Sequence, residues 1–220
     1  MLKMNPKILL IGMALTDFPR LNRFVAGHRL WERRGIWLSL SAKQRLDRDG
    51  LVFSTKIRFD PTESLVTFAE RMQRTLQHGR RGEAASDKEI GLLVRLPRFA
   101  LRLLMWLQPR LDRLGLLPQR LIEDDPLYAS AFVANLGSVG LDAAYHHLFE
   151  YGTVPIFVTM GRVHRVPLVH ADGSVGSHEV FVLRYTYDER IEDGFYAARA
   201  LEALAGYLAD PAALSGASSE

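Results

Sequence analysis

The turn DERIEDG, residues 188–194, concentrates side chains that could do acid–base chemistry. Four of its residues carry carboxylates, and it separates a strand-like stretch, 179–188, from a helix-like stretch that runs to about residue 208. A carboxylate at such a junction can act as a general acid or base, and Glu189 and Asp193 are the candidates. The turn could instead be held by ion pairs, and we expect Asp193 and Arg190 to form a structural pair.

The adjacent histidines His146 and His147, in the stretch YHHLFEYGT, are the second candidate for chemistry. An imidazole titrates near neutral pH, so either ring could serve as a general base, and Glu189 could orient it as a carboxylate does in a triad. Alternatively, one ring packs against the sheet and the other points to water. The pair does not predict a metal site, because adjacent residues on one element point apart and no further ligand set is evident.

Length and composition predict one globular domain. The chain has 220 residues, of which 48% are hydrophobic and 24% are charged, and its net charge of +3 gives no reason to expect a nucleic-acid partner. Cysteine is absent, which excludes disulfides, zinc–thiolate sites and a cysteine nucleophile. Any reacting thiol must therefore come from the substrate, and we expect a cytoplasmic protein because this composition fits a reducing compartment.

The order of the predicted elements is a helix, a hairpin, a second helix, a helical insertion, further strands and a closing helix. The hairpin is expected from RGIWLSLSAK and LVFSTKIRFD, and the second helix from Asp60 as N-cap, with Pro61 at its first position and Glu63 completing a capping box. We predict a single domain over residues 1–210 and a flexible tail over 211–220.

The helical insertion, residues 91–126, is rich in leucine and arginine and contains three prolines, Pro97, Pro109 and Pro118. The prolines predict short, broken helices. A wide apolar face could form a lid over an acyl chain, a partner-binding surface or, over 91–117, a membrane-surface contact. We expect instead an extra packed layer, because broad apolar faces are usually buried.

Several segments, in order, resemble the catalytic domain of the 2-oxoacid dehydrogenase dihydrolipoamide acyltransferases, relatives of chloramphenicol acetyltransferase. They are FPRLN, GIWLSLSAK, FVANLGSVG, IFVTMGR and YDERIEDGFYAARALEALAGYLADP. The resemblance implies an α/β fold with a mixed, largely antiparallel sheet covered by helices. It also implies a homotrimer or larger homo-oligomer with active sites between subunits, and acyl transfer between coenzyme A, as a substrate, and a dihydrolipoyl or similar acceptor.

This sequence departs from the family pattern at two functional positions. The family reads Asp-His-Arg, two variable residues, then Asp-Gly, and here Glu189 occupies the position of the histidine base. The family's oxyanion-stabilising Ser or Thr is replaced by Ala134. Four matched residues, Asp188, Arg190, Asp193 and Gly194, belong to the turn, and we expect them to shape it. We interpret three more, Asn135, Gly137 and Ser138, as a strand-to-loop bend on the side where we expect the substrate to bind.

These two changes are costly for the family mechanism. The pKa of a substrate thiol, ~8.5, lies about two units above that of a histidine and about four units above that of a glutamate. The free-energy cost of proton transfer to the base therefore grows by about 3 kcal/mol, or up to ~10²-fold in rate. Loss of one oxyanion donor typically costs ~10²–10³-fold more. We therefore predict a coenzyme A- or thioester-dependent acyltransferase with an altered active site, in which Glu189 and His146 or His147 take part. The alternative is a catalytically silent member that binds acyl groups or acts as a scaffolding subunit.

Overall fold

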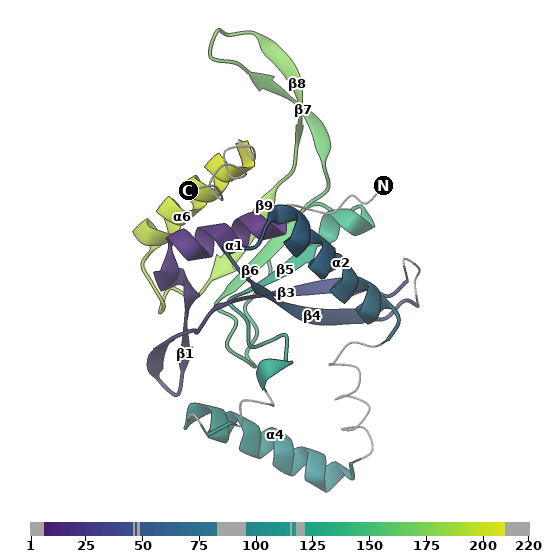
Figure 1. Ribbon diagram of the computed structural model, residues 1–220, viewed down its shortest axis with the longest axis vertical. Coiled ribbons are helices and arrows are strands. Elements are labelled where there is room, and N and C mark those ends of the chain that lie inside the picture. The colour runs from purple at the N-terminus through teal and green to yellow at the C-terminus, as the bar shows by residue number, and fades with distance from the viewer. Residues whose placement is uncertain are drawn as a thin grey trace.

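A five-stranded mixed sheet forms the centre of the computed structural model, which describes residues 7–45, 47, 49–82, 96–114, 116–117 and 122–209. The strand order is β4-β3-β5-β6-β9 (Figure 1). The bounds of these strands are Ile36–Lys43 for β3, Val52–Phe59 for β4, Ala131–Asn135 for β5, Ile156–Met160 for β6 and Leu183–Tyr187 for β9. The α/β class and the mixed sheet predicted from the sequence are confirmed.

The remaining elements are helices and two separate hairpins. The helices are α1 (Lys7–Asp17), α2 (Leu65–Arg80), α4 (Arg98–Arg113) and α6 (Gly194–Ala209), with short 3₁₀ turns η1 (Pro19–Asn22) and η2 (Leu136–Val139). The hairpins are β1 (Arg23–Ala26) with β2 (Arg29–Glu32), and β7 (His164–Val169) with β8 (Val175–Val180).

The directions of the strands decide which loops share an edge of the sheet. Strands β3, β5 and β6 are mutually parallel, whereas β4 and β9 run antiparallel to their neighbours. The loop after β5 and the loop after β6 therefore leave from one edge. The turn after β9 leaves from the other edge, because Tyr187 at the end of β9 pairs with Ile156 at the start of β6.

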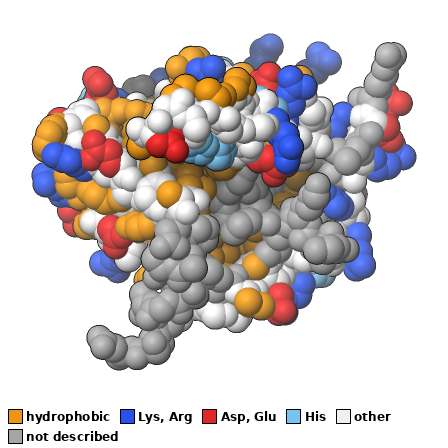
Figure 2. Space-filling model, turned by 90° about the horizontal axis from the view of Figure 1, so that it is seen from above, with side chains coloured by type: hydrophobic (Ala, Val, Ile, Leu, Met, Phe, Trp, Pro, Cys, Tyr) orange, Lys and Arg blue, Asp and Glu red, His pale blue; other side chains and the backbone are white. Residues whose placement is uncertain are grey.

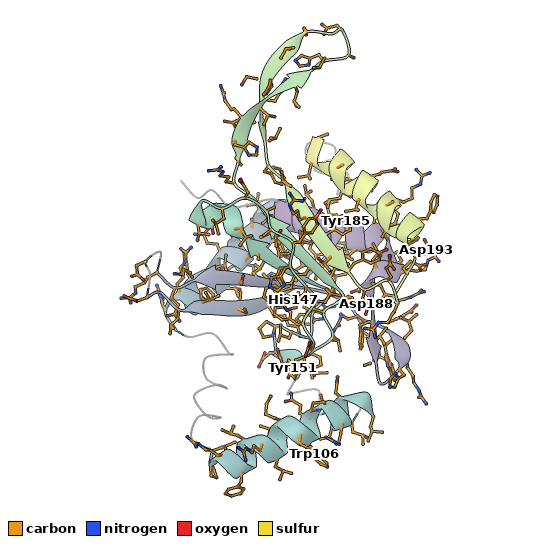
Figure 3. All side chains as sticks on the ribbon, turned by 180° about the vertical axis from the view of Figure 1, so that it is seen from behind. Trp106, His147, Tyr151, Tyr185, Asp188 and Asp193 are labelled. Atoms are coloured by element: carbon orange, nitrogen blue, oxygen red, sulfur yellow. The ribbon has the colours of Figure 1, made fainter. Side chains whose placement is uncertain are left out.

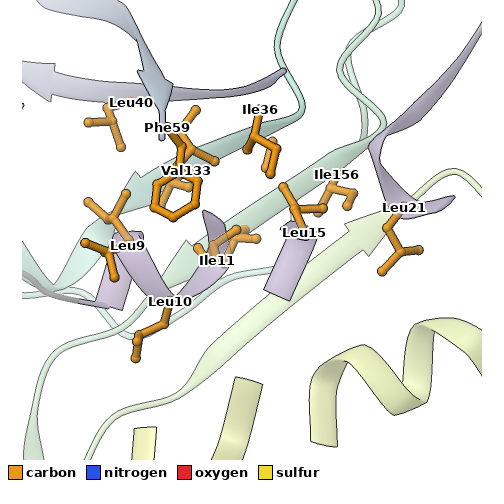
Figure 4. Close-up of a cluster of buried hydrophobic side chains, with 14 of the residues drawn as sticks. Leu9, Leu10, Ile11, Leu15, Leu21, Ile36, Leu40, Phe59, Val133 and Ile156 are labelled. Atoms are coloured by element: carbon orange, nitrogen blue, oxygen red, sulfur yellow. The ribbon is translucent and has the colours of Figure 1, made fainter. Parts of the chain in front are cut away.

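The main core lies between one face of the sheet and helices α1, α2 and α6. Leu38, Val133 and Val158 point to this face from three adjacent strands and are buried. The first helix has the apolar run ILLIGMAL, whose side chains are nearly all buried, and α6 packs against α1. Figure 4 shows Leu9, Ile11 and Leu15 of α1 meeting side chains of the sheet. Burial of this apolar surface is the main driving force that holds the helices to the sheet.

A smaller cluster lies on the opposite face of the sheet. Phe132 and Phe157 stack there at 5.1 Å between ring centroids, and Phe149 packs against both from a loop. Ala134 belongs to the same cluster. Because alternate residues of a strand point to opposite faces, this second face carries the side chains that the helices do not cover.

The two hairpins project from the body of the molecule (Figure 1). The β1–β2 hairpin was not predicted, since its strands have only four residues each. Near the end of the β7–β8 hairpin, Nε2 of His170 lies 3.1 Å from Nε2 of His178. Seen from above, histidine side chains lie among acidic and basic ones near the middle of the view (Figure 2).

The predicted start of the second helix was wrong. The second helix begins at Leu65 with Ser64 as its N-cap, whose hydroxyl accepts from the Thr67 backbone N–H at 3.1 Å. Asp60 instead closes a turn with Thr62, and Glu63 pairs with Arg71 instead of completing a capping box. Asp and Ser are both good N-caps, and here the hydroxyl of Ser64 caps α2 while the Asp60 carboxylate accepts from Thr62 in the preceding turn.

Among the described residues of the insertion, α4 runs without a break from Arg98 to Arg113, where short, broken helices were predicted. Pro97 occupies the N-cap of α4 and Pro109 lies inside the helix. The expected burial of its apolar face is also wrong, because Phe99, Leu103 and Trp106 are 74%, 59% and 54% exposed. In Figure 1 α4 lies apart from the sheet. Residues 91–95, 115 and 118–121 of the insertion, and the tail 211–220, lie outside the described residues.

Candidate functional site

The turn after β9 is held by an ion pair that differs from the predicted one. The Arg190 guanidinium donates to both oxygens of Asp188, from Nε at 2.8 and 3.0 Å and from Nη2 at 2.6 Å. Partial burial would raise the pKa of Asp188, but the hydrogen bonds from Arg190 outweigh it and lower the pKa below its ordinary value. The predicted pairing of Arg190 with Asp193 was wrong, because a residue two positions away reaches the guanidinium with both oxygens.

Asp193 is the N-cap of α6. Its Oδ1 accepts from the Tyr196 backbone N–H at 2.9 Å, which satisfies one of the amides at the start of the helix. Gly194 is the first residue of α6 and is not among the glycines with positive φ, so the turn does not depend on the left-handed region. A Cβ at Gly194 would meet the Tyr187 hydroxyl at 3.5 Å, an ordinary contact.

The rest of the turn is anchored to the N-terminal part of the chain. Glu192 pairs with Arg20 at 3.2 Å and with Arg23 at 3.5 Å, and the Ile191 side chain is 2% exposed in the main core. Glu189 differs from these residues: its side chain is exposed, and within the described part of the chain no hydrogen bond or ion pair involves it. Burial raises the pKa of Tyr187, and the nearby Glu189 carboxylate raises it further.

The segment with the two histidines crosses the second face of the sheet. Three side chains of the sheet hold its backbone: Arg184 Nε donates to the Ala143 carbonyl at 2.9 Å, Thr159 to Ala144 at 2.6 Å and Thr186 to His146 at 2.6 Å. In Figure 3 His147 is seen in front of the sheet, in a view from the side away from α1 and α2. Sequence reasoning missed these three anchors, because only the strand register brings them under the segment.

His146 is packed and its tautomer is set by a hydrogen bond. Its ring stacks on Phe157 at 3.9 Å and on His147 at 4.8 Å. Nδ1 lies 2.6 Å from the His147 carbonyl oxygen, and because a carbonyl only accepts, Nδ1 carries the proton. In the neutral ring Nε2 is then the unprotonated nitrogen, able to accept a proton. The exposed His147 covers the ring on its other side.

Ala134 lies in a row of small polar side chains on the same face. In register it pairs with Ser41 of β3 on one side and with Thr159 of β6 on the other. Adjacent strands are about 4.8 Å apart, so two hydroxyl-bearing residues flank the methyl group of Ala134. Ser41 is half-buried, and Thr159 already donates to Ala144. The sequence alone carries no signal for Ser41, since its neighbour is 93 positions away.

The residues after Ala134 form the expected bend. The Asn135 side chain accepts from the Ser138 backbone N–H at 3.2 Å, and the Ser138 hydroxyl donates to the Asn135 carbonyl at 2.7 Å. A Cβ on Gly137 would lie 2.6 Å from the Gly161 carbonyl oxygen, so only glycine allows the two loops to approach so closely. Contact of these residues with a substrate stays a prediction.

The structure places the candidates in two groups. His146 and Glu189 lie toward the edge of the sheet where β9 ends, because Thr186 of β9 donates to the His146 carbonyl and Glu189 follows that strand. Among the described residues no hydrogen bond joins Glu189 to either imidazole. Asn135 and Ser138 leave the sheet from the opposite edge. Within the residues that the structure describes, no three His, Asp or Glu side chains are grouped to hold a metal ion.

A polar cluster lies below the second face, near α4. Tyr151 donates to Asp125 at 2.9 Å and receives a hydrogen bond from Gln108 of α4. Lys56 of β4 donates to the Ile122 carbonyl at 2.9 Å, and burial, followed by the nearby Arg33, lowers the pKa of Lys56 to about 8. The cluster attaches the end of the insertion to the sheet.

An apolar cavity of about 290 Å³ lies on the helical side, between α1, α6, β6 and β9. Of the described residues that line it, only Tyr185 and Tyr187 have a polar side chain. The cavity lies on the opposite face of the sheet from His146, whose ring stacks on Phe157 of the second cluster.

Comparison with known proteins agrees with the resemblance in the sequence. Residues 119–215 match the family model of the 2-oxoacid dehydrogenases acyltransferase (catalytic domain). The matched part of the acyltransferase pattern spans β5 to α6 and so includes the histidine pair, the bend and the DERIEDG turn. A search of the curated proteins finds no match.

Solved acyltransferase structures share the fold. The dihydrolipoamide acetyltransferase of Azotobacter vinelandii superposes with a TM-score of 0.65 and 18% identity, covering 97% of this chain and 71% of the other. The cubic core of a pyruvate dehydrogenase multienzyme complex gives 0.63 and 17%, with 94% and 69% covered. A probable dihydrolipoamide acetyltransferase from Listeria monocytogenes gives 0.61 and 17%, with 91% and 67% covered. At these identities the likeness confirms the predicted fold.

Proposed function

We propose that this chain is an acyltransferase of the 2-oxoacid dehydrogenase acyltransferase type, which moves an acyl group from coenzyme A or another thioester to a thiol acceptor. The observation that carries the proposal is the hydrogen bond from Nδ1–H of His146 to the His147 carbonyl, because it leaves Nε2 of the neutral ring as a base. The family match over residues 119–215 supports the acyl-transfer chemistry.

His146 replaces the family's missing base in this mechanism. Nε2 takes the proton from the acceptor thiol, and the thiolate sulfur attacks the carbonyl carbon of the acyl thioester. The new carbon–sulfur bond forms as the carbonyl electron pair moves to oxygen. The oxyanion then collapses, the original carbon–sulfur bond breaks, and the departing thiolate takes the proton back from His146. A role for Glu189 stays a prediction, because no hydrogen bond joins it to either imidazole among the described residues.

Ser41 is the proposed donor to the oxyanion. Ala134 has no hydroxyl, and Ser41 is its partner in the neighbouring strand, with a hydroxyl on the same face. The Azotobacter acetyltransferase has been investigated for the role of a serine, a histidine and an asparagine in its catalytic mechanism. In this chain Ser41 would donate a hydrogen bond to the oxyanion and His146 would act as the base, each from a position other than the family's.

A homotrimer would join the two groups of candidates. His146 and Glu189 lie toward one edge of the sheet, and Asn135 and Ser138 leave from the other, so a site using both groups is best built between two copies. One related structure is the core of a multienzyme complex, which supports assembly into a homo-oligomer.

The direct test measures acyl transfer. Purified chain is incubated with acetyl-coenzyme A or a long-chain acyl-coenzyme A and dihydrolipoamide, and released coenzyme A is quantified by chromatography. We expect His146→Gln to lower the rate by ~10²–10⁴-fold, the usual contribution of a general base. The control is His164→Gln, which removes an imidazole on β7 and should leave the rate unchanged. Failure of the wild-type chain to release coenzyme A would favour the silent acyl-binding or scaffolding subunit.

A further inference from the structure

Helix α4 is apolar on two opposite sides. Its inner side has partly buried leucines, Leu101, Leu104 and Leu111, and Gln108 on that side donates to the Tyr151 hydroxyl. Its outer side carries Phe99, Leu103, Trp106 and Leu107, which are all exposed. The outer residues are spaced i, i+4, i+7 and i+8, so they form one continuous stripe along the helix. In Figure 3 Trp106 is seen on α4, which lies apart from the sheet.

The charges around this outer stripe are all positive. Arg98, Arg102 and Arg110 are exposed, and the Arg110 guanidinium lies 3.7 Å from the centroid of the Trp106 ring. The only carboxylate of the helix, Asp112, lies on the inner side and is partly buried. Within α4, which the structure describes from Arg98 to Arg113, the outer face therefore combines bulky apolar and aromatic side chains with arginines and has no acidic group.

We propose that α4 binds the surface of an anionic membrane, with the stripe Phe99, Leu103, Trp106 and Leu107 inserted at the boundary between headgroups and acyl chains and the arginines beside lipid phosphates. An interfacial helix is recognised by this combination of a bulky apolar stripe and a basic flank. Positive charge without acidic neighbours complements an anionic lipid surface. No helix among the described residues is long and apolar enough to cross a membrane.

Membrane binding is independent of acyl transfer in this proposal. The stripe lies on α4, whereas His146 and Ser41 belong to the second face of the sheet. Vesicle binding can therefore be tested without any catalytic readout, and its failure would leave the proposed acyltransferase function untouched.

The test is sedimentation of the full chain with sucrose-loaded vesicles of phosphatidylglycerol and phosphatidylcholine, beside vesicles of phosphatidylcholine alone. We expect binding to the anionic vesicles that weakens with salt. The variants Arg102→Gln and Arg110→Gln should each weaken it by roughly fivefold, the usual contribution of one basic side chain near an anionic surface. Leu103→Gln should weaken it at least as much, because a buried apolar side chain is lost.

Matched controls use exposed residues elsewhere. Trp31→Phe changes a tryptophan that is 44% exposed on β2, and Arg165→Gln removes an arginine of the β7–β8 hairpin; neither should change binding. Brominated lipids should quench tryptophan fluorescence in Trp31→Phe and lose that effect in Trp106→Phe. Equal binding to neutral and anionic vesicles would overturn the proposal. So would a stripe variant that binds vesicles normally but changes the oligomeric state, since a second copy would then cover the stripe.

Discussion

Glu189 and Ser138 lie beyond opposite edges of one sheet. Ser138 follows β5, which is parallel to β6, and Glu189 follows β9, which is antiparallel to it. Each step along a strand is about 3.3 Å, so the five residues of β6 separate the two edges by roughly 13 Å. We expect a reaction centre that brings both groups into contact to be built from two copies of the chain, as in the proposed homo-oligomer.

A shared site predicts complementation between inactive variants. His146→Gln and Ser41→Ala each remove one half of the proposed site, so chains unfolded together and refolded as mixed oligomers should regain about a quarter of the sites. Acyl-coenzyme A turnover measures the recovery, and separately refolded variants are the control. A mixture no more active than its components would show that both residues act within one copy. Analytical ultracentrifugation should find a trimer or a multiple of it.

Restoring a hydroxyl at Ala134 should increase the acyl-transfer rate. The Ala134→Ser side chain would lie between Ser41 and Thr159, where an oxyanion donor is worth up to ~10²–10³-fold in rate. Its burial costs about 1 kcal/mol of unfolding free energy if the hydroxyl lacks a partner. Steady-state kinetics and denaturant unfolding separate the two effects. Ser41→Ala should lower the rate at unchanged stability; unaltered kinetics would remove Ser41 from the mechanism.

Asp193 should act on stability through its helix cap. Asp193→Ala removes the acceptor for the Tyr196 amide and should lower the free energy of unfolding by about 1 kcal/mol. Asp193→Asn keeps a cap of similar strength and serves as the control. Urea denaturation provides the measurement. If Asp193→Asn unfolds normally yet loses acyl transfer, the carboxylate has a role in catalysis.

Two glycines should respond to alanine in opposite directions. Gly137→Ala would put a Cβ 2.6 Å from the Gly161 carbonyl oxygen, so the two loops must separate and the protein should lose about 1–3 kcal/mol. A Cβ on Gly206 of α6 meets nothing within 4 Å, so Gly206→Ala should add about 0.5–1 kcal/mol through helix propensity. Thermal unfolding of the two variants beside the unaltered chain measures both changes in stability. A neutral Gly137→Ala would mean that the bend is not constrained.

Stability should depend on pH through Lys56. Its pKa is lowered to about 8 in the folded chain from 10.5, so between these values the unfolded chain binds more protons and the free energy of unfolding rises with pH. Allowing for partial exposure, the rise should be roughly 1 kcal/mol between pH 8 and 9.5, below the range where tyrosines titrate. Lys56→Met should abolish it, while Lys43→Met, a change on β3, should retain it. If the free energy of unfolding rose with pH equally in both variants, Lys56 would not be the cause.

Local patterns in the sequence were enough for much of the fold. The strands β3 and β4 follow from alternating apolar residues, and α1 and α6 from apolar runs that end at Pro19 and Pro211. The resemblance to the acyltransferase family rested on short segments whose order is preserved, and the family match over 119–215 confirms it. Such features depend on neighbours in the chain, so the sequence alone could determine them.

The pairings at the candidate site depended on tertiary structure. Arg190 could reach either Asp188 or Asp193, and the geometry of the turn chose Asp188. The neighbour of Ala134 is Ser41 because of strand register, which no local pattern encodes. The apolar stripe of α4 looked like a core face in the sequence, and only packing shows that it remains exposed. Composition and spacing therefore determined most of the elements, while register and packing decided which side chains meet, because those contacts join residues far apart in the chain.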